Sequence, residues 1–302
     1  MNPIARRLLR WYRGHGRAGL PWRTGRHPYH TVVSEFMLAQ TQVDRVVPQF
    51  DAFVARFPNF SALAHATPAD VVRQWKGLGY NSRAVRLRRL AEAIVERHGG
   101  ELPRDREALR SLPGVGPYTA AAIRAFAFDL DDAPIDTNIR RIVNRLAFGL
   151  EYPHAAAPRD VDARARALLP SGRAHDWNSA LMDLGATICT ARAPKCLICP
   201  LRQDCAAAPV DPAQLERLRA AAGRRSPKER QPFERTTRYA RGRIVDRLRE
   251  LGPGERISFI DLHHAIGSAM PERSVEEIQE VVAALARDGL VTHDGTSVAL
   301  QE

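Results

Sequence analysis

Four cysteines lie within 17 residues of this 302-residue chain, in the pattern C-x6-C-x2-C-x5-C. They are Cys189, Cys196, Cys199 and Cys205, and the chain has no other cysteine. Four thiolates spaced this closely are what a tetrahedral metal site or a [4Fe–4S] cluster requires. A structural zinc site usually has two C-x2-C pairs, whereas only Cys196 and Cys199 form one here. The spacing therefore favours an iron–sulfur cluster over zinc, and over four cysteines with a purely structural or redox role.

A glycine turn and two carboxylic acids are the other groups that could do chemistry. Gly114 and Gly116 form a tight turn between two predicted helices, where backbone N–H groups can bind an anion such as a phosphate. Asp136 precedes a predicted helix, a position where Asp is ordinarily the N-cap and where a carboxylate stays ionised. Glu35 lies on an otherwise apolar helix face, so it is either a solvated surface residue or a buried acid that keeps its proton.

Helices have to position these groups. Apolar residues recur at helical spacing through residues 36–50 and 85–95, and Pro and Gly separate such runs. Strand-like alternation is almost absent, so residues 1–205 are predicted to be mainly α, with a core of two helical lobes. Residues 206–235 lose the apolar periodicity and gain charge and proline, which is typical of a basic linker with one short helix.

Residues 236–302 predict a small separate domain. Helices are expected at 241–251, 261–266 and 274–288, a short β segment at 257–259 and a hairpin within 290–300. This pattern indicates a winged-helix-like domain, in which the last helix of DNA-binding examples enters the major groove. That helix carries three glutamates in its first half, which phosphates would repel. A structural or protein-binding role is therefore favoured over DNA reading.

The charge distribution suggests a polyanionic partner. The formal net charge is +11, with +14 on residues 1–235 and −3 on residues 236–302. An arginine-rich proteome from GC-rich DNA would explain part of this excess. No apolar run approaches the length of a membrane span, and the N-terminus lacks the apolar core of a secretory signal. Because thiolate ligands need a reducing compartment, we expect a cytoplasmic monomer without membrane contact.

The cysteine spacing resembles the cluster loop of the endonuclease III superfamily of DNA glycosylases. The string L-P-G-V-G-x-x-T-A at residues 112–120 resembles the superfamily's helix-hairpin-helix, which grips a DNA phosphate. The shared catalytic Asp stands 18 residues after a variable hairpin position, and Asp136 stands 18 residues after Tyr118. The resemblance implies that Asp136 stabilises or attacks the cationic sugar, with Asn138 orienting it. Bifunctional members carry Lys at the variable position to form a Schiff base, so Tyr118 implies a monofunctional enzyme.

Residues 34–42, SEFMLAQTQ, resemble the S-E-x-M-L-Q-Q-T-Q of MutY-like adenine DNA glycosylases, whose Glu protonates the departing purine. Adenine is a poor leaving group until a ring nitrogen is protonated. Glu35 as the acid and Asp136 as the base therefore make a coherent pair.

The same resemblance implies a set of DNA contacts. Leu20, Trp22 and Arg23 belong to a segment that lines the base pocket, and Tyr80 is the aromatic wedge pushed into the base stack, with Gln40 and Thr41 beside it. A structural role in the core is the alternative for Trp22 and Tyr80.

The chain also departs from the family pattern. Ala39 replaces a Gln, Asn81 replaces a common second Tyr, and Ser179 replaces an amide or acid that can face the base. Residues 225–302 lack the Phe-Ser-His loop of the Nudix-like domain with which well-known MutY-like enzymes read 8-oxoguanine.

The leading hypothesis is a monofunctional DNA glycosylase of base excision repair that carries a [4Fe–4S] cluster. It would flip out and excise adenine mispaired with 8-oxoguanine or guanine in double-stranded DNA. One alternative is a thymine or uracil mismatch glycosylase acting opposite guanine, against which Glu35 argues. The other is a non-catalytic iron–sulfur DNA-binding protein, which would not need both Glu35 and Asp136.

Overall fold

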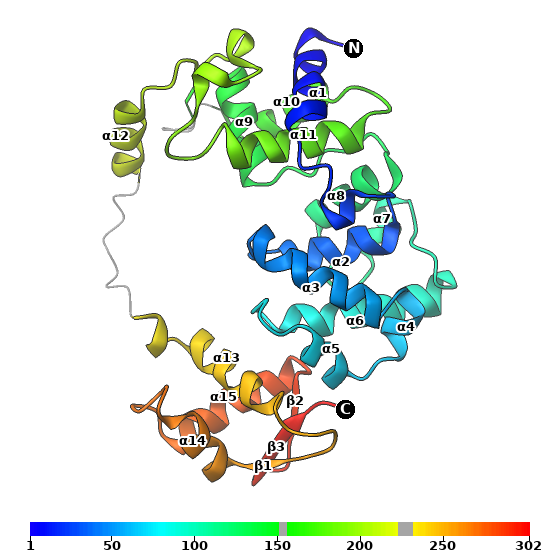
Figure 1. The fold of residues 1–302 in the computed structure, drawn as a ribbon, viewed down its shortest axis with the longest axis vertical. Helices are drawn as coiled ribbons and strands as arrows, with labels where there is room; N and C mark the ends of the chain where they lie inside the picture. The colour runs from blue at the N-terminus through cyan, green and yellow to red at the C-terminus, as the bar shows by residue number, and fades with distance from the viewer. Residues whose placement is uncertain (151–155, 223–231) are drawn as a thin grey trace. The chain divides into compact units, whose positions relative to one another are not determined.

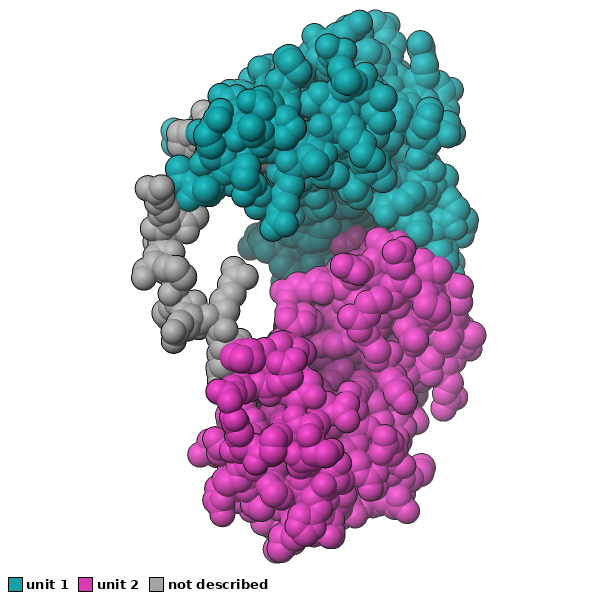
Figure 2. Space-filling model, turned by 60° about the vertical axis from the view of Figure 1, so that its left-hand side comes forward, with its two compact units in different colours: residues 1–31, 104–110, 115–228 teal, residues 32–103, 111–114, 229–302 magenta. Residues whose placement is uncertain are grey.

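The computed structural model describes residues 1–150, 156–222 and 232–302, and in these it is mainly helical with one small sheet near the C-terminus (Figure 1). The mainly α prediction is confirmed. The chain forms two compact units (Figure 2). Unit 1 comprises residues 1–31, 104–110 and 115–228, and unit 2 comprises residues 32–103, 111–114 and 229–302. Each unit is thus built from segments that are distant in the sequence.

Unit 1 contains seven α-helices and three 3-10 turns among its described residues, and one of these helices, α12, is the one predicted within the linker. They are α1 (Pro3–His15), α7 (Arg106–Arg110), α8 (Pro117–Phe128), α9 (Thr137–Ala147), α10 (Pro158–Leu168), α11 (Ala174–Thr187), α12 (Pro212–Ala222) and the 3-10 turns η1 (Pro21–Arg23), η2 (Cys196–Ile198) and η3 (Arg202–Asp204). Helix α12 is the short helix expected in the linker, and residues 223–231 of that linker lie outside the described residues.

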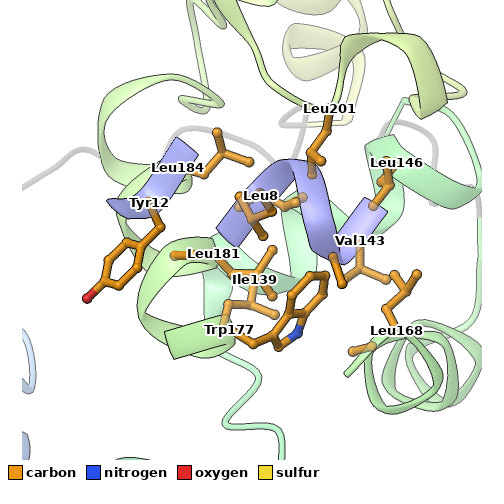
Figure 3. Packing of buried hydrophobic residues seen from close by; sticks show 14 of the residues in the cluster. Leu8, Tyr12, Ile139, Val143, Leu146, Leu168, Trp177, Leu181, Leu184 and Leu201 are labelled. Atoms are coloured by element: carbon orange, nitrogen blue, oxygen red, sulfur yellow. The ribbon is translucent and has the colours of Figure 1, made fainter. Parts of the chain in front are cut away.

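Apolar faces of α1, α9, α10 and α11 meet in one core cluster of unit 1 (Figure 3). Along α9 the buried apolar residues are 139, 142, 143 and 146, the spacing of one helix face. Leu8 from α1 and Trp177 from α11 are almost fully buried against this face. The core therefore fixes the start of α9, where Asp136 lies, and the end of α11, where the first cysteine follows.

A buried carboxylate ties the segments of unit 1 together. The side chain of Asp132 is fully buried and accepts hydrogen bonds from Arg106 at 2.5 Å, Arg124 at 3.0 Å and Arg166 at 3.0 Å. These arginines come from α7, α8 and α10. Although burial alone would raise the pKa of Asp132, the hydrogen bonds from Arg106 and its neighbours hold it below its usual range.

We expect Asp132→Asn to destabilise the protein by about 3 kcal/mol at pH 7, because a buried ion-pair network loses its anion. A carboxyl whose pKa is lower in the folded state stabilises the fold above about pH 4 and loses that contribution as the pH falls through the folded-state pKa. Urea unfolding of wild type and variant should therefore differ at pH 7 and converge below about pH 4. A difference that stays constant over this range would contradict the assignment.

The helices of unit 2 fall in two stretches of the chain, a first lobe at residues 32–98 and a C-terminal stretch at residues 232–302, which the sequence predicts as a separate domain and which is called the C-terminal domain below. They are α2 (Pro28–Leu38, from residue 32 on), α3 (Val43–Arg56), α4 (Phe60–His65), α5 (Pro68–Gln74), α6 (Ser82–His98), η4 (Phe233–Arg235), α13 (Thr237–Leu248), α14 (Phe259–Gly267) and α15 (Val275–Arg287). Helix α6 packs against α4 and α5, and Trp75 meets Phe53 edge to face with ring centroids 5.8 Å apart.

The C-terminal domain has the predicted order of three helices and a small wing. Strands β1 (Ile257–Ser258), β2 (Val291–His293) and β3 (Ser297–Leu300) form an antiparallel sheet in the order β1-β3-β2. The first helix starts at Thr237, four residues before the predicted start, because the Thr236 side chain caps it by accepting the Tyr239 N–H. The glutamates of α15 have a structural explanation: Glu277 completes a capping box with Ser274 at the positive end of the helix.

Among the described helices, none combines the length and the apolar character that crossing a bilayer would demand.

Candidate active site

Asp136 is the N-cap of α9 and has both carboxylate oxygens engaged. Its Oδ1 accepts the Ile139 N–H at 2.7 Å, and its Oδ2 accepts the Asn138 side-chain amide at 3.0 Å. The ordinary capping role of an Asp at this place therefore holds, and the predicted orienting contact of Asn138 is present. A negative charge fixed at a helix N-terminus suits a group that must face a developing positive charge.

Asn138 is itself held from behind. Its Oδ1 accepts a hydrogen bond from Arg141 Nη2 at 2.7 Å, and Arg141 also donates to the carbonyls of Gly185 and Cys189 at 2.9 and 2.8 Å. A Cβ at Gly185 would lie 2.8 Å from the Cβ of Asn138, so only glycine allows α9 and α11 to approach this closely. The orientation of Asp136 thus depends on packing that extends to the first cysteine.

The predicted base-pocket segment is anchored to α11. Asp183 is 1% exposed, and its carboxylate accepts hydrogen bonds from Arg17 at 2.8 Å and from Arg23 at 2.8 and 3.2 Å. Burial would raise the pKa of Asp183, but the hydrogen bonds from Arg23 and Arg17 hold it below its usual range. Arg23 therefore fixes the turn that carries the buried Trp22, with Leu20 at its N-cap position.

The glycine turn continues into α8. Gly116 is the N-cap residue of that helix and has no side chain to cover the first backbone N–H groups, and Tyr118 follows in its first turn with 36% of its surface exposed. Within unit 2, Gly114 has a φ of +78°, and a Cβ there would come 3.2 Å from the ring of Phe36. Gly114 therefore has a backbone reason to be glycine, and the amides at the start of α8, which no side chain caps, can bind a phosphate.

Within unit 2, Glu35 is half-buried on α2 between the buried residues Ser34 and Phe36. This position lies between the two expectations, solvated or fully buried. It leaves the acid in partial contact with solvent on a helix whose neighbouring side chains belong to the core.

A buried arginine that the sequence reading missed organises the end of α2. Arg83 is 8% exposed and donates to the carbonyls of Phe36, Met37 and Ala39 at 2.6–2.8 Å. These are carbonyls at the C-terminus of α2, which the helix itself cannot satisfy. Burial lowers the pKa of Arg83 to about 10, so its charge persists at neutral pH.

The same guanidinium holds the loop that carries the predicted wedge. Its Nη2 donates to the carbonyls of Leu78 and Gly79 and to the hydroxyl of Thr41, which in turn donates to the Leu78 carbonyl at 3.1 Å. The loops around Thr41 and Tyr80 are therefore joined through Arg83. Gln40 and Tyr80 both adopt left-handed backbone conformations, with φ of 65° and 45°. Such conformations persist only where the surroundings impose them.

The four cysteines line one small cavity of unit 1, together with Arg145. Burial raises the pKa of the Cys199 thiol to about 11 and raises that of Cys205, and the charges of the other cysteines add to the effect. Arg145 is 1% exposed and has its Nη1 3.6 Å from the Cys189 sulfur. Four thiolates in such a place require a cationic centre to compensate them, which iron supplies.

Protein-family models match both the segment that contains the glycine turn and Asp136 and the segment that contains the cysteines. A family model described as HhH-GPD superfamily base excision DNA repair protein matches residues 33–168, and one for the iron–sulfur binding domain of endonuclease III matches residues 189–205. The chain is 39% identical to an adenine DNA glycosylase of Mycolicibacterium smegmatis over 95% of this chain and 93% of that one. The chain belongs to the MutY-like helix-hairpin-helix DNA glycosylases. The glycosylase is therefore a hydrolase of N-glycosidic bonds that acts in DNA base excision repair.

Solved structures support the fold. A thermostable thymine-DNA glycosylase aligns with a TM-score of 0.61 and 33% identity over 67% of this chain and 94% of that one. An endonuclease III in a non-covalent DNA complex aligns with a TM-score of 0.57 and 21% identity over 71% of this chain and 95% of that one. At this identity the second match shows the fold alone.

The glycosylase carries a [4Fe–4S] cluster, and the segment that matches the iron–sulfur family, residues 189–205, contains all four cysteines. We expect Cys199→Ser to lower the iron content and abolish the visible absorbance of the cluster. The melting temperature should fall by at least about 5 °C, because the cluster crosslinks the end of α11 to residues 196–205. The matched control is Leu197→Ser, since Leu197 lies between two cysteines but is 79% exposed. A Cys199→Ser protein with unchanged iron content and melting temperature would contradict this role.

Proposed function

We propose that the glycosylase is monofunctional and excises adenine mispaired with 8-oxoguanine or guanine in double-stranded DNA. The fixed carboxylate of Asp136 carries the proposal. It is a full negative charge oriented by two hydrogen bonds, as stabilisation of a cationic sugar requires. Glu35 would supply the proton that adenine needs in order to leave, because neutral adenine is a poor leaving group.

Further features support the details. Tyr118 has no amine for a Schiff base, so strand cleavage through such an intermediate is not expected. The amides at the start of α8 would bind a backbone phosphate, and Trp22 and Leu20 would line the base pocket. Tyr80 would fill the space of the flipped base, with Gln40 and Thr41 beside it. We place this activity in a cytoplasmic monomer with a core at residues 1–205 and a separate domain at residues 236–302.

A thymine or uracil glycosylase acting opposite guanine is the second candidate, since the thymine-DNA glycosylase above is 33% identical. Ser179, where the family more often has an amide or acid that can face the base, is fully buried. A buried hydroxyl offers no exposed contact that would favour thymine or uracil over adenine. The higher identity over nearly the full chain is to an adenine glycosylase.

Single-turnover excision on four duplexes tests the proposal: adenine opposite 8-oxoguanine, adenine opposite guanine, thymine opposite guanine and uracil opposite guanine. Each reaction is analysed with and without alkali, which separates base removal from strand cleavage. We expect the fastest release from the adenine duplexes, with strand breaks only after alkali. Faster release of thymine or uracil would overturn the base assignment, and breaks without alkali would overturn the monofunctional one.

A further inference from the structure

The C-terminal domain contacts the predicted wedge directly. The guanidinium carbon of Arg238, in the first turn of α13, lies 3.9 Å from the centre of the Tyr80 ring. The same group lies 5.7 Å from the ring of Phe233. A guanidinium this close to an aromatic face makes a cation–π contact, which restricts the position of the ring.

A second arginine, at the other end of α13, holds the next residue of the loop. Arg249 Nη2 donates to the side-chain oxygen of Asn81 at 2.8 Å, and its Nε donates to the Val72 carbonyl at 2.9 Å. The Arg249 side chain is 5% exposed, and its third nitrogen donates to Asp246 at 2.6 Å. Asn81 occupies the N-cap position of α6 but makes no side-chain cap hydrogen bond there. Its amide oxygen is used by the C-terminal domain instead.

Tyr80 needs such support because its backbone is strained. Its φ of 45° is left-handed, and it follows Gly77 and Gly79, which have φ of +84° and +69°. A loop of this kind has many accessible conformations unless its neighbours select one. Arg83 of the first lobe donates to the carbonyls of this loop. Arg238 in α13 contacts the Tyr80 ring, and Arg249 at the end of that helix donates to the side chain of Asn81.

We propose that Arg238 and Arg249 are positioning residues through which the C-terminal domain presets Tyr80 for insertion into the base stack of duplex DNA. The inference deepens the proposed function and rests on it. It gives the domain a role that requires neither a Phe-Ser-His loop nor a DNA-reading helix. The acidic start of α15 is compatible with this role, because only α13 has to contact the loop.

Arg238→Gln tests the inference, since it removes the charge and keeps an unbranched polar side chain. Unstacking is measured by the fluorescence of 2-aminopurine placed next to the adenine of an A opposite 8-oxoguanine mispair, and excision is measured in single turnover. We expect both the fluorescence gain and the excision rate to fall about fivefold to tenfold, as the loss of one close cation–π contact implies. Arg238→Lys should recover part of both, because an ammonium can occupy the same face.

The matched control is Arg243→Gln, an exposed arginine on the same helix, which should behave as wild type. If the inference is right, Arg238→Gln lowers the two readouts only because it changes the position of Tyr80. We expect Arg238→Gln to have no further effect on either readout in a Tyr80→Leu background, whereas a general loss of charge would be additive. Additive effects, or equal effects of Arg238→Gln and Arg243→Gln, would overturn the inference.

The two readouts separate this inference from the proposed function. Adenine excision by wild type with an unaffected Arg238→Gln variant would overturn the positioning role alone. In a second outcome, wild type unstacks the base, Arg238→Gln does not, and neither protein excises adenine. This would overturn the adenine assignment and leave the positioning role of Arg238 intact. Absence of unstacking by wild type would overturn Tyr80 as the wedge and the inference with it.

Discussion

Asp136→Asn is expected to slow single-turnover adenine excision by about 10²- to 10³-fold, the effect of removing one well-placed electrostatic stabiliser. Asparagine caps helices as well as aspartate does, so its side-chain oxygen can still accept the Ile139 N–H. The fold and the start of α9 should therefore be retained while the negative charge is lost. Circular dichroism and duplex binding should match wild type, and a wild-type excision rate would remove Asp136 from the catalytic site.

Two further variants separate charge from capping. Asp136→Ala removes both, so it should lose the same activity and about 1 kcal/mol of stability as well. The matched control is Asp105→Asn, because Asp105 caps α7 in the same way by accepting the Ala108 N–H at 2.8 Å. It should leave the excision rate unchanged.

The ends of helices were the part of the site that the sequence could predict. The capping interpretation of Asp136 and the catalytic one turned out to be compatible, because one oxygen caps α9 and the other is oriented by Asn138. The cysteine spacing predicted the cluster, since all of its ligands lie within a short segment. Helix caps and closely spaced metal ligands depend on residues that are near one another in the sequence, so the sequence alone can predict them.

The buried arginine and aspartate networks could not be predicted in this way. Arg83 lies in an arginine-rich helix, where a charged residue is ordinarily solvated, and its acceptors are carbonyls up to 47 residues away. Asp183 likewise pairs with Arg17, 166 residues distant. The available signal was a charge at an apolar position of a helical pattern, which indicates burial but does not identify the partner.

Asn81 shows that a departure from a family pattern can have a structural role of its own. In the sequence it replaces a common second Tyr of the family. In the structure its side chain accepts a hydrogen bond from Arg249 of the C-terminal domain. The replacement and the unusual domain are therefore linked through one contact, which no comparison limited to the catalytic segment would reveal.

Glu35→Gln is expected to reduce adenine excision by about 10²- to 10⁴-fold, the usual contribution of a general acid, while duplex binding is retained. Glutamine has the same shape and can still form hydrogen bonds, but it has no acidic proton to transfer. Because Glu35 is half-buried beside the core residues Ser34 and Phe36, the isosteric change should leave α2 intact. The matched control is Asp44→Asn on the next helix, an exposed carboxylate whose loss should not affect the rate.

The pH profile gives the sharper test of Glu35, because it reports the proton rather than the shape. In wild type the single-turnover rate should fall on the alkaline side as the acid loses its proton, and Glu35→Gln should lose that limb together with most of the rate. Asp136→Asn should keep the limb at a lower rate, since its acid is untouched. A Glu35→Gln variant that is slow but keeps the wild-type profile would show that Glu35 orders the base pocket, and the proton would then have to come from another group.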